Sequence, residues 1–274
     1  MQQTHSDSPV RLVALDIDGT LITPGASPDA LPGDAMTRAV RRVTDAGICV
    51  VLASGRMYPG TLAVAQHVGI TQPLICQQGA SVHDLDGTLR HGHRIDPTIA
   101  LELIAYARRY RWSVAWFDSV QYLVTSPTRE AQFFADVSRV PMQIVPYPEK
   151  TNVVATGIDI ISSRSDARRV HRELEHRYGA RLSILDFPSV TAVHAASASK
   201  GAALQQLAEE LGVAQAEVLA IGDSVNDVSM LKWAGQSAAP AHSDDYATRA
   251  AKELLPGTGV DGVVAKLNAI SKQV

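Results

Sequence analysis

Short apolar runs and amphipathic segments alternate at both ends of this chain. Apolar runs at residues 12–15, 48–53, 73–76 and 217–221 have the length and composition of buried strands. Between the first two runs, residues 34–47 place apolar side chains at helical spacing. A strand, a helix and a strand in this length form a right-handed crossover, which makes the strands parallel. We therefore predict an α/β fold with a doubly wound, mainly parallel sheet (a Rossmann-like core).

The pattern changes in the middle of the chain. From about residue 83 to residue 190, strand-like runs are interleaved with helical segments, which is typical of an α+β unit with an antiparallel sheet. We expect residues 83–190 to form an inserted α+β cap domain, and residues 1–82 and 191–274 to form the core. Residues 141–148, which include three prolines, are expected to form a stiff loop.

Two carboxylates follow the first apolar run. Strand alternation would place Asp16 and Asp18 on one side, with Ile17 turned into the core. Such close carboxylates repel each other unless a divalent cation neutralises them, and oxygen ligands of this kind suit Mg²⁺. One carboxylate could then act as a nucleophile and the other as a general acid and base. The alternative is an ordinary strand-to-turn junction, in which Asp-Gly is common.

The same short motif occurs a second time, at residues 84–89. A polar segment precedes it in place of a buried strand, and Asp-Gly between short alternating segments indicates a hairpin. We therefore predict that Asp84 and Asp86 lie in a surface turn. The nearby histidines match no closed zinc pattern, so a solvated hairpin is expected there.

Three further segments carry candidate phosphate or metal ligands. Ser54 and Gly55 end the second strand at a helix entrance, where a hydroxyl and backbone N–H groups can hold a phosphate, although Ser54 could be a plain helix cap. Lys200 lies in a first helical turn, which suits a lysine aimed at a carboxylate and a phosphoryl group. Asp223 ends another strand and would complete a cation site with Asp16 and the Asp18 carbonyl. Asp227 fits either that site or a capping box.

Composition excludes several classes of function. The net charge of −3 gives no basic footprint for nucleic acid, and no apolar segment approaches the length that spans a bilayer. The two isolated cysteines form no disulfide framework, which fits a reducing cytoplasm. Residues 1–8 lack a signal pattern and are expected to be a short frayed tail. The oligomeric state does not follow from the sequence.

The four segments Asp-Ile-Asp-Gly-Thr, Ser-Gly-Arg, Ser-Lys-Gly and Gly-Asp-Ser-Val-Asn-Asp resemble, in order and spacing, the motifs of the haloacid dehalogenase superfamily. The large insertion resembles that of the Cof-type (class IIB) branch. The resemblance implies a Mg²⁺-dependent phosphatase that hydrolyses a small phosphorylated metabolite, a sugar phosphate or similar monoester, through an aspartyl-phosphate. The roles that it implies for single residues are nucleophile for Asp16, general acid and base for Asp18, phosphate ligands for Ser54, Gly55, Lys200 and Asn226, and metal ligands for Asp16, the Asp18 carbonyl and Asp223.

Two alternatives and one departure accompany this interpretation. A phosphosugar mutase could use the same core, and a non-catalytic phospho-acceptor module could keep the same acidic pocket. A general acid at Asp18 argues against the second, because a receiver that keeps its phosphate does not need one. Gln78 stands where the resembling family usually has Asn, so the substrate contacts at this position are open.

Overall fold

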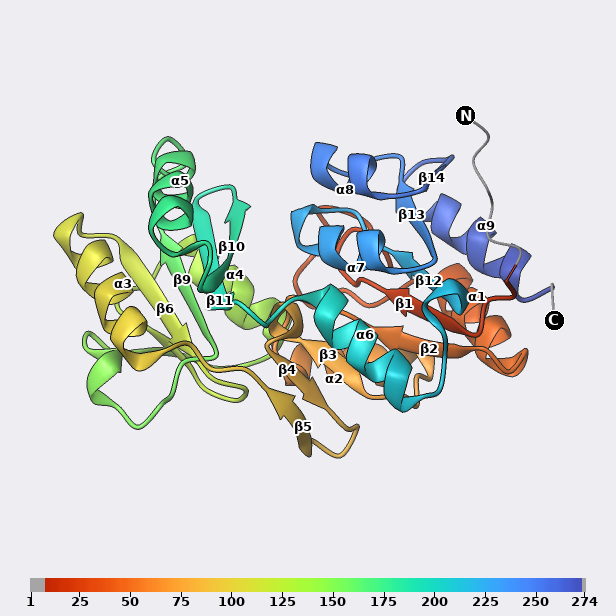
Figure 1. The fold of residues 1–274 in the computed structure, drawn as a ribbon, viewed down its shortest axis with the longest axis horizontal. Helices are drawn as coiled ribbons and strands as arrows, with labels where there is room; N and C mark the ends of the chain where they lie inside the picture. The colour runs from red at the N-terminus through yellow and green to blue at the C-terminus, as the bar shows by residue number, and fades with distance from the viewer. Residues whose placement is uncertain (1–7, 273–274) are drawn as a thin grey trace.

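A five-stranded parallel sheet forms the centre of one half of the computed structural model, which describes residues 8–272 (Figure 1). The expected frayed tail lies outside the described residues apart from Ser8. The strands are, in spatial order, β14 (Glu253–Leu255), β13 (Gln236–Pro240), β12 (Val218–Ile221), β1 (Leu12–Leu15) and β2 (Cys49–Leu52). β1 lies between β12 and β2, so its carboxyl end opens between neighbours on both sides.

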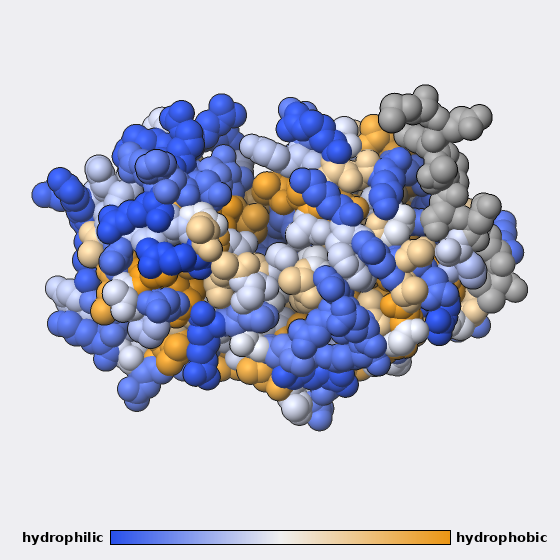
Figure 2. Space-filling model, in the orientation of Figure 1, coloured by the Kyte–Doolittle hydropathy of each residue, from blue (hydrophilic) through white to orange (hydrophobic). Residues whose placement is uncertain are grey.

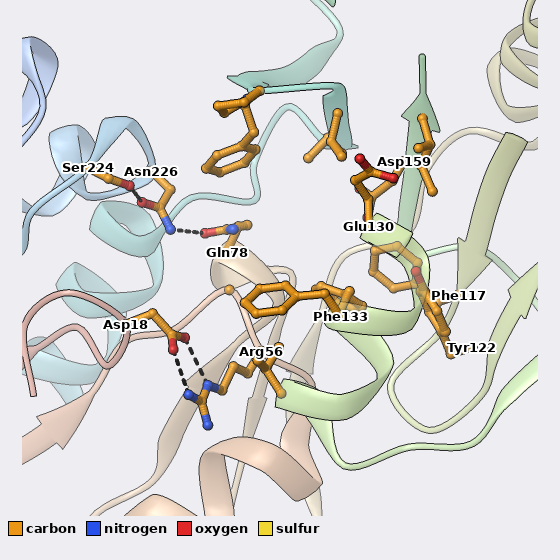
Figure 3. Close-up of a pocket in the computed structure, with 18 of the residues that line it drawn as sticks. Asp18, Arg56, Gln78, Phe117, Tyr122, Glu130, Phe133, Asp159, Ser224 and Asn226 are labelled. Carbon is orange, nitrogen blue, oxygen red and sulfur yellow. Dashed lines mark hydrogen bonds and ion pairs between the residues drawn. The ribbon is translucent and has the colours of Figure 1, made fainter. Parts of the chain in front are cut away.

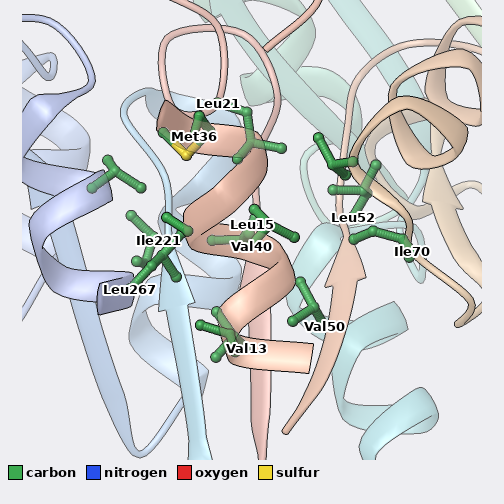
Figure 4. Packing of buried hydrophobic residues seen from close by; sticks show 14 of the residues in the cluster. Val13, Leu15, Leu21, Met36, Val40, Val50, Leu52, Ile70, Ile221 and Leu267 are labelled. Atoms are coloured by element: carbon green, nitrogen blue, oxygen red, sulfur yellow. The ribbon is translucent and has the colours of Figure 1, made fainter. Parts of the chain in front are cut away.

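Both faces of this sheet are covered by helices. Side chains alternate along β1: Val13 and Leu15 belong to one buried cluster, shown in Figure 4, while Leu12 and Ala14 belong to another. The first face packs against α1 (Asp34–Asp45), α2 (Tyr58–Val68) and α9 (Asp261–Ile270), and the second against α6 (Lys200–Glu210), α7 (Val228–Trp233) and α8 (Asp245–Ala250). The predicted doubly wound fold is confirmed.

A small antiparallel sheet continues the core beyond β2. It consists of β3 (Leu74–Cys76), β4 (Ser81–His83) and β5 (Leu89–Gly92), and an isolated bridge from Ala53 to Ile75 joins it to the end of β2. The second copy of the acidic motif lies in the turn of the β4–β5 hairpin, as predicted, where Asp86 Oδ1 accepts from Thr88 N at 2.9 Å. The solvated character expected of this hairpin is wrong for His83, which is buried and stacks on Tyr58 with ring centroids 4.8 Å apart.

A six-stranded sheet forms the other half of the molecule (Figure 1). Its strands are, in spatial order, β10 (Leu182–Phe187), β11 (Val190–Ala195), β9 (Gly157–Ile161), β6 (Ser113–Phe117), β7 (Tyr122–Val124) and β8 (Met142–Ile144). All neighbours are antiparallel except β7 and β8. One face packs against α3 (Pro97–Arg109) and α5 (Ala167–Tyr178), and the other packs in part against α4 (Arg129–Ser138).

The ends of the inserted segment follow from strand pairing. Residue 190, the expected boundary, is the first residue of β11, and β11 pairs along its length with β10 and β9. β4, which contains the expected starting point, pairs with β3 and β5. We therefore propose that the cap domain extends from about residue 93 to residue 195.

Two short strands were missed or assigned to a loop. The stiff loop expected at residues 141–148 contains β8, because Met142–Ile144 pairs with β7. Residues 253–255 form the edge strand β14. Both strands have three residues, two of them exposed in each strand, so their sequences carry little periodicity and their structure comes from pairing with a neighbour.

Hydrogen bonds and close packing join the two halves beside the carboxyl end of β1. The Gln77 amide donates to the Asp118 carbonyl at 2.5 Å and accepts from the Thr156 hydroxyl at 3.1 Å. The backbone N–H of Met57, before α2, donates to Ser138 Oγ in α4 at 3.1 Å. These contacts hold the six-stranded sheet over the crevice of the parallel sheet.

Candidate active site

A cavity of about 510 Å³ lies between the carboxyl ends of the parallel strands and the six-stranded sheet. Figure 2 shows apolar residues in the hollow between the two halves of the molecule. The core contributes the polar wall of the cavity, and the cap contributes a wall rich in aromatic side chains. Of the predicted site residues, those lining the cavity are Asp16, Asp18, Gly55 and Asn226.

Asp16 is held by a buried lysine. Lys200, fully buried at the start of α6, donates to Asp16 Oδ1 at 2.5 Å and to Asp227 Oδ1 at 2.6 Å. Burial alone would lower the pKa of Lys200, but the two carboxylates raise it above its ordinary value, so the lysine stays charged. The local mismatch of a lysine in a first helical turn is thus offset by two buried ion pairs.

Asp223 completes the group. Oxygens of Asp16, Asp223 and Asp227 lie within 4.8 Å of one another. Gly19 permits this approach: its φ is +89°, and a Cβ there would lie 2.2 Å from an Asp223 oxygen. Burial, followed by the charge of Asp227, raises the pKa of Asp223 to about 7 and that of Asp16 well above its usual range.

The three carboxylates fit a divalent cation. With Lys200 they carry a formal charge of −2, which a divalent ion would cancel. Both oxygens of Asp227 are already engaged, Oδ1 by Lys200 and Oδ2 by the backbone N–H groups of Asp223 and Ser224. Asp227 therefore acts as support, and the free oxygens of Asp16 and Asp223 are those suited to a hard metal ion.

Asp18 is oriented by an arginine. β1 ends at Leu15, so the two carboxylates lie in the following turn, and strand alternation is not what brings them together. Ile17 is buried as expected. The Arg56 guanidinium donates to both Asp18 oxygens, and its side chain is 3% exposed against 52% for Asp18 (Figure 3). The pair holds the Asp18 side chain at the wall of the cavity.

The proposed phosphate ligands surround the same turn. Ser54 is fully buried, and its hydroxyl oxygen accepts a hydrogen bond from the backbone N–H of Arg56 at 3.1 Å. A Cβ on Gly55 would lie 2.4 Å from the Gln78 amide nitrogen, so any larger residue at position 55 would clash with the Gln78 side chain as it is placed here. Gln78 Oε1 accepts from Asn226 Nδ2 at 2.9 Å (Figure 3). Gln78, which stands where the resembling family usually has Asn, therefore holds Asn226 beside the cavity.

The cap wall carries buried polar groups. Asp159, in the middle of β9, is 7% exposed, and its Oδ1 has no hydrogen-bond partner within residues 8–272. The hydroxyl of Tyr122 is likewise buried without a partner in the described chain. Burial raises the pKa of Asp159 to about 7. Burial also lowers the pKa of His194 to about 4, and this neutral ring donates through Nδ1 to the Thr156 carbonyl at 3.0 Å.

Sequence reasoning assigned no role to Arg56 or Asp159. Arg56 was part of a recognised motif, but its partner lies 38 positions earlier in the chain. Asp159 interrupts the strand-like run at residues 153–161, and a lone acid in such a run is a signal that could have found it.

No helix within residues 8–272 has the length and apolar character that crossing a bilayer requires.

Comparisons with known proteins agree with this geometry. The family model of the haloacid dehalogenase-like hydrolases matches residues 13–267. A 5-amino-6-(5-phospho-D-ribitylamino)uracil phosphatase of Bacillus subtilis is 25% identical over 97% of both chains. A phosphoglycolate phosphatase of Halobacterium salinarum is 28% identical over 94% of this chain and 96% of its own.

The fold also matches a solved structure. A sugar phosphatase of haloacid dehalogenase subclass IIB superposes with a TM-score of 0.81 at 18% identity, covering 95% of this chain and 98% of its own. The chain belongs to the haloacid dehalogenase-like hydrolases and is a phosphate monoester hydrolase.

Proposed function

We propose that this phosphatase hydrolyses a small phosphorylated metabolite through an aspartyl-phosphate on Asp16. The observation that carries the proposal is the buried contact of Lys200 with Asp16, beside Asp223. A phosphate dianion repels an attacking carboxylate, so the site has to supply positive charge and fixed geometry. A charged lysine bound directly to the attacking group supplies both at that atom.

Asp16 and Asp18 have different roles in the proposed reaction. Asp16 attacks phosphorus, the bond to the leaving oxygen breaks, and Asp18 gives that oxygen a proton. Asp18, now a carboxylate, takes a proton from water as the water attacks the aspartyl-phosphate, which releases inorganic phosphate and restores Asp16. Arg56 fixes the orientation of the Asp18 side chain for both proton transfers. The Ser54 hydroxyl, the Gly55 backbone and Asn226 are proposed to hold the phosphoryl oxygens.

We propose Mg²⁺ as the cation held by Asp16, Asp223 and the backbone carbonyl of Asp18. The donor set supports this choice, since carboxylate and carbonyl oxygens suit a hard ion. When bound, Mg²⁺ supplies positive charge next to the phosphoryl oxygens and helps to orient the ester.

The nature of the leaving group does not follow from the relatives. The uracil-derivative phosphatase and the phosphoglycolate phosphatase are named for very different esters, at 25% and 28% identity. The roles proposed here for the core residues involve only the phosphoryl half of a substrate. Selection of the leaving group must therefore depend on the cap side of the cavity.

Single-turnover kinetics with p-nitrophenyl phosphate test the covalent step, because nitrophenolate leaves without help from an acid. Asp16→Asn should abolish nitrophenolate release, while Asp18→Asn should give a burst of one nitrophenolate per site and a phosphorylated protein detectable by intact mass. Asp86→Asn, in the second copy of the motif, is the matched control and should behave as wild type. A burst in Asp16→Asn would refute the assignment, and an isomerised ester in place of inorganic phosphate would identify a mutase.

A further inference from the structure

The cap wall of the cavity presents hydrogen-bond acceptors that the chain itself leaves unused. Asp159 Oδ1 has no partner within residues 8–272, although the residue is more than nine-tenths buried. In His194, Nδ1 donates to a carbonyl, so Nε2 is the unprotonated nitrogen and can only accept. Both residues line the cavity. A buried acceptor without a partner is costly, so the presence of Asp159 on a cavity wall calls for a donor from a ligand.

The residues directly beside Asp159 in the sheet are small. Its partners in register on the adjacent strands are Ala115 and Ala192, both with the smallest side chain that a strand ordinarily carries. Tyr122, whose hydroxyl is also buried and unpartnered in the described chain, lines the same side of the cavity (Figure 3). Small neighbours therefore leave the Asp159 side chain on the wall of the cavity, which a second polar group also lines.

Aromatic and aliphatic side chains form most of the remaining cap wall. Those lining the cavity are Phe117, Phe133, Phe134, Val137, Ile161, Phe187 and Val190. Figure 3 shows Phe133 between the Asp18–Arg56 pair and the side of the cavity that carries Asp159. Flat rings bury large apolar area between such walls and gain offset or edge contacts with them.

We propose that the substrate's leaving group is a flat aromatic or heteroaromatic ring with an N–H donor, which Asp159 accepts while the phosphate lies at Asp16. This inference rests on the proposed phosphatase function and names its substrate class. It differs from the sugar phosphate that the sequence favoured. Each hydroxyl of a polyol would lose its water against the apolar wall, and only a few acceptors stand ready to replace that water.

A matched series of esters tests the proposal. The substrates are benzyl phosphate, 3-aminobenzyl phosphate and glucose 6-phosphate, which share a primary alcohol leaving group and differ in the ring and the N–H donor. At pH 8, where Asp159 is ionised, we expect kcat/KM to rank 3-aminobenzyl above benzyl by roughly ten- to a hundredfold, as a hydrogen bond to a charged acceptor gives, and both above glucose 6-phosphate.

Two variants and a control locate the effect. Asp159→Asn keeps the size of the side chain but removes the charged acceptor, so the preference for 3-aminobenzyl over benzyl phosphate should fall at least tenfold. Tyr122→Phe removes a single hydroxyl and should lower the same preference by roughly threefold. Asp186→Asn changes a carboxylate of β10 that does not line the cavity and should leave the preference unchanged. Circular dichroism confirms that each variant is folded.

Different outcomes distinguish this proposal from the phosphatase assignment. A faster reaction with glucose 6-phosphate than with either aromatic ester, or an equal loss on all esters in Asp159→Asn, would overturn the proposal while leaving the phosphatase intact. If no ester released phosphate, calorimetric binding of 3-aminobenzyl phosphate would decide: Asp159-dependent binding would support the cap site, and binding that Asp159→Asn does not weaken would overturn it.

Discussion

Arg56 grips the Asp18 carboxylate with two hydrogen bonds, Nε to Oδ2 at 2.8 Å and Nη2 to Oδ1 at 2.6 Å. The guanidinium is buried and the carboxylate is half exposed, so the arginine is the fixed member of the pair. This fork geometry is specific to arginine. It fixes the orientation of Asp18, which activates water in the second half of the proposed reaction.

Arg56→Lys should therefore slow hydrolysis of the aspartyl-phosphate more than its formation. A lysine keeps the charge but loses the two-point grip, so Asp18 is held less firmly when it acts as a base. With p-nitrophenyl phosphate we expect a rapid burst near one nitrophenolate per site, then a steady state about ten- to a hundredfold below wild type. Stopped-flow absorbance measures both phases.

The β4–β5 hairpin offers a matched control for that substitution. Arg90 pairs with Asp84 at 2.7 Å, in the second copy of the acidic motif. Arg90→Lys makes the same change in an exposed arginine–aspartate pair outside the cavity and should leave both kinetic phases as in wild type. Equal slowing of the burst and the steady state in Arg56→Lys would show that Arg56 serves the first step as much as the second.

Gln78 positions Asn226 and has an unfavourable backbone conformation. The residue has φ +59°, a left-handed conformation that Asn tolerates better than Gln. Gln78→Asn should therefore raise the Tm slightly, while its shorter side chain loses the 2.9 Å contact with Asn226 and lowers kcat/KM by about three- to tenfold. Calorimetry and steady-state kinetics check the two effects. A loss of stability together with full activity would contradict both arguments.

Metal binding should stabilise the folded chain through Asp223. Three carboxylates share one lysine, so a divalent ion relieves their repulsion only in the folded state. At a Mg²⁺ concentration of about 100 times Kd, the free energy of unfolding should rise by about 2.7 kcal/mol. Asp223→Asn should lose most of this gain, whereas Asp86→Asn should keep it. Urea unfolding with and without Mg²⁺ gives the comparison, and an equal gain in all three proteins would place the ion elsewhere.

The sequence was most informative where a buried strand ends in a polar motif. Asp16, Ser54 and Asp223 follow strands of one parallel sheet, and the carboxyl ends of such strands share an edge, so their proximity could be predicted without coordinates. The hairpin at Asp84 and Asp86 was predictable for a related reason, because the Asp-Gly turn lacks a preceding buried strand.

Contacts across the cavity could not be predicted in the same way. The cap wall depends on how β9 and β6 pair, and register fixes that Asp159 lies between Ala115 and Ala192. The local hydrophobic pattern predicts that the segment is a strand, but it does not predict which strands pair with it. The contact between Gln78 and Asn226 likewise joins loops that are 148 positions apart, and it depends on the full arrangement of the core.

Asp159 should make the stability of the protein depend on pH. Its pKa of about 7 in the folded chain lies above the ordinary value of 3.8, so between these values the folded protein holds a proton that the unfolded chain has released. By linkage, this group lowers the free energy of unfolding as pH rises from about 4 to about 7. The loss is complete above pH 7 and absent below pH 4.

Asp159→Asn removes that dependence. We expect the variant to exceed wild type in free energy of unfolding by a few kcal/mol at pH 8, and to match it within about 1 kcal/mol at pH 4. Urea unfolding at the two pH values measures the difference, with Asp186→Asn as the control on the same sheet. A gain that is equal at both pH values would mean that ionisation is not its source. A variant less stable than wild type at pH 8 would mean that the carboxylate is paired in the free protein, and the open acceptor on which the cap proposal depends would not exist.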